Sequence, residues 1–286
     1  MDSLTYDFTL ISETFAHGAY QTQNFNRPEL RAPSLKGVIR SWHEALGYSK
    51  ADALTIFGQV SDRRNGIDGN FASRIMIRVT PLSEVRTGKT DFMPHKGANG
   101  GSKSAIEPGA RYRLMITQRR ETLPPPLWEQ VKRATQAWLF LGAVGQRANR
   151  GCGCPWPAKD APTTPAAYLD VCGSLLNGTS IRVALLDYQA DTSRMLRDVS
   201  GRFPRSTECN IPGAVFGSVD PRKPSPLKLR AVQLNDRLHL AAVWLPRDPY
   251  NDTAGNLRAG IEAMIQIPGK KDLGLLLQKA LPIFAS

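Results

Sequence analysis

One order of elements occurs twice along this chain, and that repetition limits the possible folds more than any single motif does. In the first half, alternating apolar residues predict a strand at 4–12. A helix is expected within 32–47, with Ser34 as its N-cap behind a proline. A Phe-Gly pair, strands at 73–80 and 110–117, and a helix after the prolines at 124–126 complete this half. The helices are predicted from two apolar stripes, formed by Leu35, Val38, Ile39, Trp42 and Leu46, and by Leu127, Val131, Ala134, Trp138 and Leu141.

The second half repeats this order. Strands are predicted at 180–187, 225–232 and 238–245, a helix at 191–203 behind Asp191 or Thr192, a Phe-Gly pair at 216–217, and helices at 256–266 and 272–281. Two matched halves indicate a duplicated β-α-β-β-α unit, hence an α+β fold of two tandem ferredoxin-like, or RRM-like, domains. The proline-rich connection at 155–167 predicts domains at 1–158 and 159–286. Sheets of this kind keep helices on one face and leave the other for a ligand.

The charge of the chain indicates an anionic partner. Lysine and arginine number 37 against 25 acidic residues, for a net charge of +12. Such a field attracts nucleic acid or an anionic membrane. The most apolar run, at 138–144, is far shorter than the roughly 20 residues that span a bilayer. The first residues lack an export signal, so we expect a cytoplasmic protein with no membrane association.

Neither a metal nor a cofactor is expected. The cysteines include one C-x-C pair, Cys152 and Cys154, and the four histidines show no ligand spacing near any cysteine. We also find no order of residues that suggests a hydrolase triad or a nucleotide-binding fingerprint. An unrelated basic enzyme is therefore the weakest of the functional hypotheses.

The stretch GAVGQRANRGCGC at 142–154 combines flexible backbone with permanent positive charge. It lacks the Gly-Lys-Ser/Thr ending of a P-loop, and it follows a helix rather than a strand, which excludes a dinucleotide fingerprint. Glycine amides and arginine forks suit phosphate oxygens. The alternative is a helix cap followed by a turn. The candidate RNA-binding residues here are Gly145, Arg147, Arg150, Gly151 and Gly153.

The start of the first helix is a second candidate, because unpaired amides and a partial positive charge occur at helix N-termini. Gly37 is expected in the first turn, with Lys36 and Arg40 four residues apart on its polar side. The alternative is a solvated basic helix face. The candidate residues here are Arg31, Ser34, Lys36, Gly37 and Arg40.

The segment at 84–109 is a third candidate, since so long a stretch without periodicity is functional or mobile. Lys89, Lys96 and Lys103 supply positive charge, and Phe92 with Met93 could stack against bases. His17 is the fourth candidate. An acid–base role beside Glu13 or Tyr20 is one interpretation, and an RNA contact is the favoured one.

These motifs together resemble the RAMP superfamily of CRISPR proteins. The resemblance rests on RAPSLKGVIRSW, IFG, SRIMIRV, the loop QRANRG after a helix, and VFG followed by SPLKLRAV, in that order. Within the superfamily, the pattern is most similar to the family of first subunits of the type III-B Cmr effector complex. The resemblance implies paired ferredoxin-like folds and a glycine-rich loop at the position of 142–154. It also implies a thumb, which we assign to the 84–109 segment, that separates parts of the guide–target duplex.

The resemblance implies a non-catalytic RNA-binding subunit in antiviral defence. Its partners would be guide RNA, target RNA and other RAMP subunits, with contacts near the 3′ end of the guide. Some RAMP proteins cleave CRISPR repeats with a histidine, so a metal-independent endoribonuclease using His17 is the alternative. Those nucleases carry their glycine-rich loop near the C-terminus, whereas this loop is in mid-chain.

Overall fold

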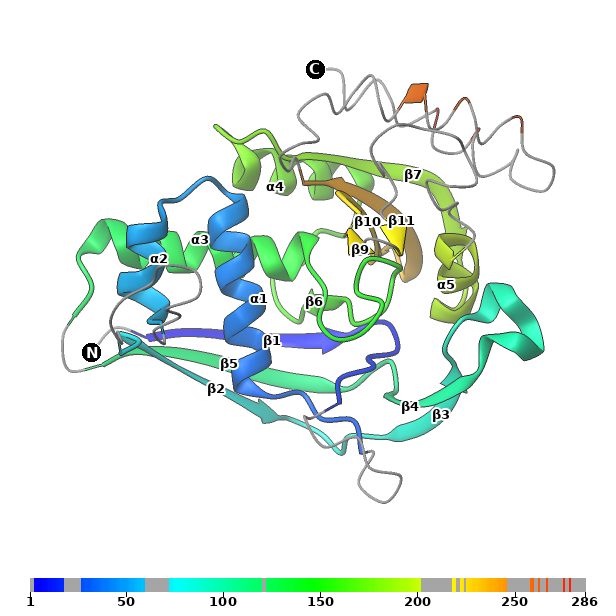
Figure 1. Cartoon of the computed structure of the whole chain (residues 1–286), viewed down its shortest axis with the longest axis horizontal. Helices are drawn as coiled ribbons and strands as arrows, with labels where there is room; N and C mark the ends of the chain where they lie inside the picture. Colours follow the sequence, from blue (N-terminus) through cyan, green and yellow to red (C-terminus); the bar gives the residue numbers. More distant parts are fainter. Residues whose placement is uncertain are drawn as a thin grey trace.

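The computed structural model describes residues 3–17, 27–59, 72–119, 122–201, 218–219, 222–223 and 225–245, with isolated positions after residue 257. The first part of the chain builds an antiparallel sheet in the order β2-β5-β1-β6. Its strands are β1 (Ser3–Leu10), β2 (Ile75–Pro81), β5 (Arg111–Gln118) and β6 (Pro155–Pro157). Helices α1 (Ala32–Ala45), α2 (Lys50–Phe57) and α3 (Pro125–Leu141) lie over one face of this sheet (Figure 1).

The second part builds a smaller antiparallel sheet in the order β10-β11-β7. Its strands are β7 (Arg182–Ala190), β10 (Leu227–Leu234) and β11 (Arg237–Trp244). Asn235 and Asp236 join β10 to β11 with φ values of 47° and 60°, as a two-residue hairpin turn requires. Helices α4 (Pro165–Leu176) and α5 (Ser193–Gly201) and the short pair β8 (Ser218–Val219) and β9 (Arg222–Lys223) complete the described elements.

A long β-hairpin extends beyond the first sheet and reaches α5 (Figure 1). It consists of β3 (Thr87–Asp91), β4 (Ser102–Ile106) and, at the tip, the 3-10 helix η2 (Pro94–Gly100). The segment at 84–109 is therefore built from regular structure. Its strands escape a periodicity search because they are mostly small and polar, and only Ala105 and Ile106 are buried.

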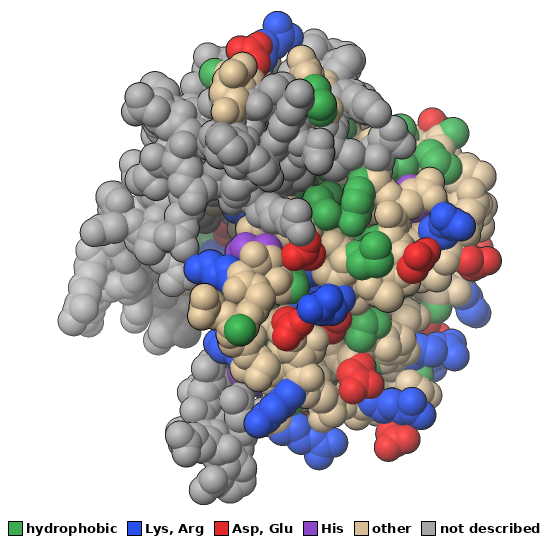
Figure 2. Space-filling model, turned by 90° about the vertical axis from the view of Figure 1, so that its right-hand side faces the viewer, with side chains coloured by type: hydrophobic (Ala, Val, Ile, Leu, Met, Phe, Trp, Pro, Cys, Tyr) green, Lys and Arg blue, Asp and Glu red, His purple; other side chains and the backbone are tan. Residues whose placement is uncertain are grey.

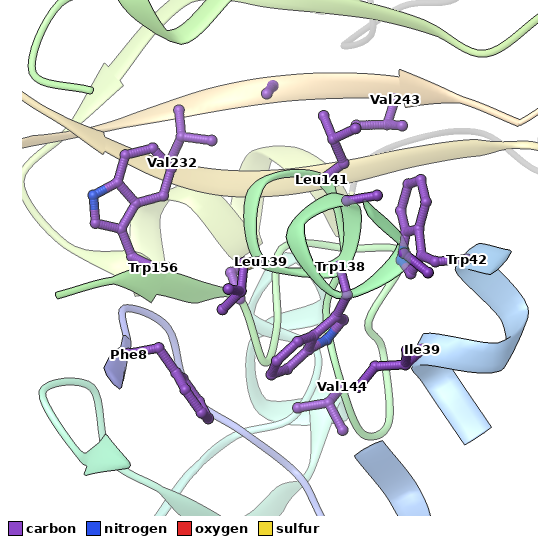
Figure 3. Packing of buried hydrophobic residues seen from close by; sticks show 14 of the residues in the cluster. Phe8, Ile39, Trp42, Trp138, Leu139, Leu141, Val144, Trp156, Val232 and Val243 are labelled. Carbon is purple, nitrogen blue, oxygen red and sulfur yellow. The ribbon is translucent and has the colours of Figure 1, made fainter. Parts of the chain in front are cut away.

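Helix α3 lies between the two sheets and packs against both. In Figure 3, Trp138, Leu139 and Leu141 of α3 lie between β1 and the second sheet. The nearest labelled residues are Phe8 of β1 on one side, and Val232 and Val243 of the second sheet on the other. Buried side chains from both parts of the chain form one continuous cluster. The apolar stripe of α3 is narrow, yet the helix is buried on two sides because its end meets the second sheet.

The mixed helix and sheet architecture confirms the sequence prediction, and the six predicted strands correspond to β1, β2, β5, β7, β10 and β11. The N-cap prediction for Ser34 is wrong, because Arg31 is the cap and Ser34 lies inside the first turn, where Pro33 is readily accommodated. For α5, the Thr192 hydroxyl accepts a hydrogen bond from the Met195 amide at 3.3 Å, so Thr192 is the capping residue. Sequence analysis missed α2, α4 and β6. The expected helices at 256–266 and 272–281 and the Phe-Gly pair at 216–217 fall largely or wholly outside the described residues.

Candidate nucleic-acid interface

The glycine-rich loop at 142–154 joins α3 to β6 and is tied to the end of β1 by main-chain hydrogen bonds. The amide of Gln146 donates to the Phe15 carbonyl at 3.0 Å, and the amide of Gly153 donates to the Glu13 carbonyl at 3.0 Å. Within the loop, the amide of Val144 donates to the Gly153 carbonyl at 2.9 Å. These bonds give the loop a fixed shape.

The loop also adds to the outer strand of the second sheet. The Leu229 amide of β10 donates to the Asn149 carbonyl at 3.2 Å, and the Gly151 amide donates to the Leu229 carbonyl at 2.9 Å. Arg150 and Leu229 thus form a parallel bridge. The loop is therefore a structural joint between the two sheets.

This pairing corrects one part of the sequence prediction. The amides of Gly151 and Gly153 were expected to face a ligand, but both donate to carbonyl groups of the chain itself. Glycine is needed here for close approach of the backbone to itself. Gly145 and Gly153 have φ values of 90° and 65°, and a Cβ at either position would press on the carbonyl of Phe15 or of Val144. The amides of Gly151 and Gly153 are therefore not available to a ligand.

A groove of about 330 Å³ lies between α1, the loop and β10. Helix α1 contributes a face of small residues, Ser34, Gly37 and Ser41, spaced by three and four positions. Space near Gly37 is open, since a Cβ there would meet no atom within 4 Å. The opposite side of the groove is formed by Gly145, Ala148, Asn149 and Lys228, among other residues. Among the candidate residues, Ser34 and Gly37 of α1 and Gly145 of the loop therefore line one groove.

Lys36 and Arg40 do not line this groove. Burial lowers the pKa of Lys36, and the neighbouring Arg119 and Arg40 lower it further. Arg40 donates to Glu44 at 3.0 Å and to the Gly58 carbonyl at 3.1 Å. These contacts put both side chains on the flank of α1. The prediction that Gly37 lies in the first turn is also wrong, because α1 begins at Ala32.

Several positively charged groups gather where the hairpin meets the loop. The Lys103 ammonium of β4 lies 4.3 Å from the centre of the Phe92 ring, and the Arg147 guanidinium lies 5.5 Å from it. Phe15 packs edge-on against the same ring at 5.1 Å. Phe92 is therefore half-buried among these neighbours, and its expected stacking against bases stays a prediction. His17 lies next to Lys103, which together with burial lowers the pKa of this histidine.

The two loop arginines are half-buried. Burial lowers the pKa of Arg147. Burial, followed by the charge of Arg147, lowers the pKa of Arg150 to about 10. Both therefore remain cationic at neutral pH. Arg31 is the N-cap of α1, and its Nε is buried without a hydrogen-bond partner among the described residues.

Glu13 joins the end of β1 to α5 and has no role beside His17. Its carboxylate accepts a hydrogen bond from Arg197 at 2.8 Å and another from the Ser193 hydroxyl at 2.7 Å. Arg197, which is 1% exposed, also donates to the Asp91 carbonyl of the hairpin at 2.5 Å. The acid–base pairing of His17 with Glu13 is therefore not formed, and Tyr20 lies outside the described residues.

The hairpin is docked on α5 and is not a free arm. Arg194 of α5 forms an ion pair with Asp91 at 2.9 Å, and His95 lies against Gly201. Lys89 and Lys96 are exposed. The face that carries α5 and the hairpin tip mixes positive and negative side chains (Figure 2). This face is therefore not a basic surface.

Sequence analysis missed Lys228 and Ser41 as members of the groove. Ser41 continues the helical spacing of Ser34 and Gly37, and that signal was present in the sequence. No pattern in the sequence around Lys228 indicates that it lies at the groove. Within the described ranges, no group of three histidine, cysteine or acidic residues could hold a metal ion. In the same part of the chain, no helix has the length and apolar character needed to cross a membrane.

Comparison with known proteins gives three kinds of similarity. A family model described as the RAMP superfamily matches residues 7–154. The CRISPR system Cmr subunit Cmr1-1 of Pyrococcus furiosus is 31% identical over 150 residues, which are 44% of this chain and 40% of that protein. The chain therefore matches about two fifths of the length of this curated relative.

Solved structures share the fold at low sequence identity. The crystal structure of Cmr1 from Pyrococcus furiosus in its apo form has a TM-score of 0.55 at 18% identity, covering 87% of this chain and 89% of that one. A chain from the cryo-EM structure of the type III-B Cmr-beta bound to cognate target RNA has a TM-score of 0.51 at 9% identity, covering 84% and 94%. A chain from a second Cmr-beta structure, with target RNA, AMPPnP and ssDNA, has a TM-score of 0.53 at 9% identity. The match covers 91% of this chain and 98% of that one.

Proposed function

The chain belongs to the RAMP superfamily, and from this we propose that it is a non-catalytic RNA-binding subunit of a type III-B CRISPR effector complex of the Cmr type. In this role it contacts guide RNA and the guide–target duplex near the 3′ end of the guide, beside other RAMP subunits, in a prokaryotic cytoplasm. The observation that carries the proposal is the family match, which spans α1, the hairpin and the whole glycine-rich loop. The similarity to Cmr1-1 and to chains of RNA-bound Cmr-beta supports it.

We also propose that the chain consists of two ferredoxin-like domains divided at residue 158. The order β6-β1-β5-β2 supports this for the first domain, because it places the fourth strand beside the first and the third in the centre. The three described strands of the second sheet take the corresponding order, β7-β11-β10. The boundary follows the end of β6, the last strand of the first sheet.

In this proposal the RNA strand follows the groove between α1, the loop and β10 and continues to the cationic groups at the hairpin. The small side chains of Ser34, Gly37 and Ser41 let the strand approach the helix closely. Lys228 lies at the groove, and Lys103 and Arg147 lie around Phe92. Because these groups suit phosphate and sugar rather than base edges, binding is independent of sequence, as variable guides require.

The salt dependence of RNA affinity tests this function. If about six basic side chains meet phosphates of single-stranded RNA, log affinity falls against log salt with a slope of roughly −4. Fluorescence anisotropy with an unstructured labelled RNA between low and moderate salt measures it. A flat dependence, or no binding by folded protein, would contradict the proposal.

A double substitution tests the flank of α1. Lys36→Ala with Arg40→Ala removes two cations, so affinity should fall and the slope should decrease by about 1.4. Lys132→Gln is the matched control, because this exposed lysine of α3 is paired with Glu129 away from the groove. Equal affinity of the double variant and the control would remove this flank from the interface.

Incubation with repeat RNA in the presence of a chelator tests the non-catalytic assignment. The wild-type protein should leave the RNA intact. Site-specific cleavage that is lost in His17→Ala would instead establish a metal-independent endoribonuclease.

A further inference from the structure

Building on the proposed function, we infer that His17, Lys103 and Arg147 form a site for one phosphodiester group of the bound RNA, and that His17 takes up a proton as this group enters. The three residues come from separate segments: the end of the β1 segment, strand β4 of the hairpin and the glycine-rich loop. RNA binding at this site is therefore coupled to pH.

Phe92 holds the site together. Lys103 and Arg147 approach its ring to 4.3 Å and 5.5 Å, and Phe15 fixes the ring from its edge. The Lys103 ammonium also donates to the Gln146 side-chain carbonyl at 3.1 Å, which connects the hairpin directly to the loop. The two cations are thus positioned before any ligand binds.

In the part of the chain that the structure describes, no acidic side chain compensates the charge of Lys103 and Arg147. The nearby carboxylates are engaged elsewhere, Glu13 with Arg197 and Asp91 with Arg194. Within the described ranges, neither Lys103 nor Arg147 forms an ion pair, and the Arg147 guanidinium donates no hydrogen bond. Its forked donors are therefore available to the oxygens of a phosphate.

The backbone of Arg147 is a second sign of a ligand site. Its φ of 57° lies in the left-handed region, which costs an ordinary L-residue about 1 kcal/mol or more. Such strain concentrates at functional positions. Here it places a half-buried arginine against Phe92 and beside Cys152 and Arg197.

The surroundings of His17 favour its neutral form in the free protein. Neither ring nitrogen makes a well-formed hydrogen bond, although the Ser104 backbone lies against the ring. Burial and then the charge of Lys103 lower its pKa, and the Ser104 backbone only partly opposes them. The other described cations near this cluster are Arg147 across Phe92 and Arg197, whose guanidinium lies 5.8 Å from the centre of the Phe15 ring, and no described carboxylate contributes to the pKa. His17 is therefore neutral at pH 7 in the free protein.

An entering phosphodiester reverses this balance. An anion within about 4–6 Å favours the imidazolium, raising its pKa by roughly 1 unit or more. One proton then moves from solvent to the imidazole, and no covalent bond changes. Affinity for RNA rises as the pH falls through the pKa of His17 in the complex, and it levels off below the pKa in the free protein.

Anisotropy titrations from pH 8 to pH 5.5 at constant ionic strength test the coupling. A labelled uridine-only RNA is used because its bases do not titrate in this range. The wild-type protein should bind up to about tenfold more tightly at the acidic end, the equivalent of 1 pKa unit. His17→Asn should lose this rise. The control His95→Asn changes a histidine at the hairpin tip that faces α5, and should keep the rise.

A second measurement observes His17 in the wild-type protein itself. NMR titration of the histidine rings of the full-length wild-type protein, with His17→Asn used only for assignment, should show a higher pKa of His17 with RNA than without it. RNA binding with an unchanged pKa of His17, or a wild-type pH dependence in His17→Asn, would overturn the phosphate site and leave the proposed function standing. Absence of RNA binding at every pH would instead overturn the proposed function, and this site with it.

Discussion

Arg147 has a backbone conformation that suits glycine and a side chain that glycine lacks. Its φ is 57°, and its guanidinium lies 5.5 Å from the centre of the Phe92 ring without an ionic partner among the described residues. Three of the glycines in the same loop also have positive φ values, and they relieve the same kind of strain without carrying charge. The contacts of the Arg147 side chain explain why this position carries an arginine and not a glycine.

Two substitutions at this residue should separate stability from binding. Arg147→Ala and Arg147→Gly both remove the guanidinium, so RNA affinity should fall by a similar factor, about tenfold. The glycine variant should be the more stable by about 1 kcal/mol, because alanine keeps a Cβ at positive φ. Urea unfolding and RNA anisotropy on the same preparations measure both quantities. Equal stabilities would show that the loop relaxes out of the left-handed conformation.

The β3–β4 hairpin depends on α5 for its position. Arg197 donates to the Glu13 carboxylate and to the Asp91 carbonyl, so a single buried guanidinium connects the end of β1, the hairpin and α5. The Ser200 hydroxyl of α5 donates to the Arg150 carbonyl at 2.7 Å, which extends this connection to the loop. A hairpin held in this way presents Lys103 to the loop in a fixed position.

Removing the charge of Glu13 should loosen this assembly. In Glu13→Gln the buried Arg197 loses its counter-ion, which should cost about 3 kcal/mol of unfolding free energy and open the hairpin to proteolysis. Asp7→Asn is the matched control, because its partner Arg113 is 46% exposed and such surface pairs contribute little to stability. Urea unfolding and limited proteolysis compare the two. A similar small loss of unfolding free energy in both variants would show that Arg197 does not hold the hairpin in place.

The elements that sequence analysis located are those whose burial is periodic. The α3 stripe from Val131 to Leu141 and the alternating strands of both sheets are read directly from spacing. The hairpin and β6 were missed because the first is mostly polar and the second is three residues with two prolines.

At the site, the groups on the groove side of α1 and around the loop could be named as candidates. The hydrogen-bond partners of these groups could not be predicted from the sequence. The amides of Gly151 and Gly153 bond to Leu229 and Glu13, residues remote in sequence that only the folded chain brings close.

Buried histidines set how the stability of this protein responds to acid. Burial is the first cause of a lowered pKa at His17, His43 and His239. The unfolded chain, with histidine pKa values of about 6.5, therefore binds more protons than the native protein below that pH. Stability is lost as the pH falls from about 6.5 through the lower native values.

Thermal unfolding of the RNA-free protein should show this trend. The midpoint should decrease between pH 7.5 and pH 5.5, and scanning calorimetry at constant ionic strength measures it. His43→Gln should reduce the decrease, because this ring is fully buried and bonded to Gln130 at 2.7 Å. A midpoint that is level or higher at pH 5.5 would contradict the expected sign.

The pairing of the glycine-rich loop with Leu229 has a consequence for how the protein is made. The ribosome produces the loop long before it produces β10, so a nascent chain carries the loop's residues before the partner that fixes their shape. The first sheet folds early, since domains form in order of synthesis. The loop therefore takes its final shape only after β10 has been synthesised.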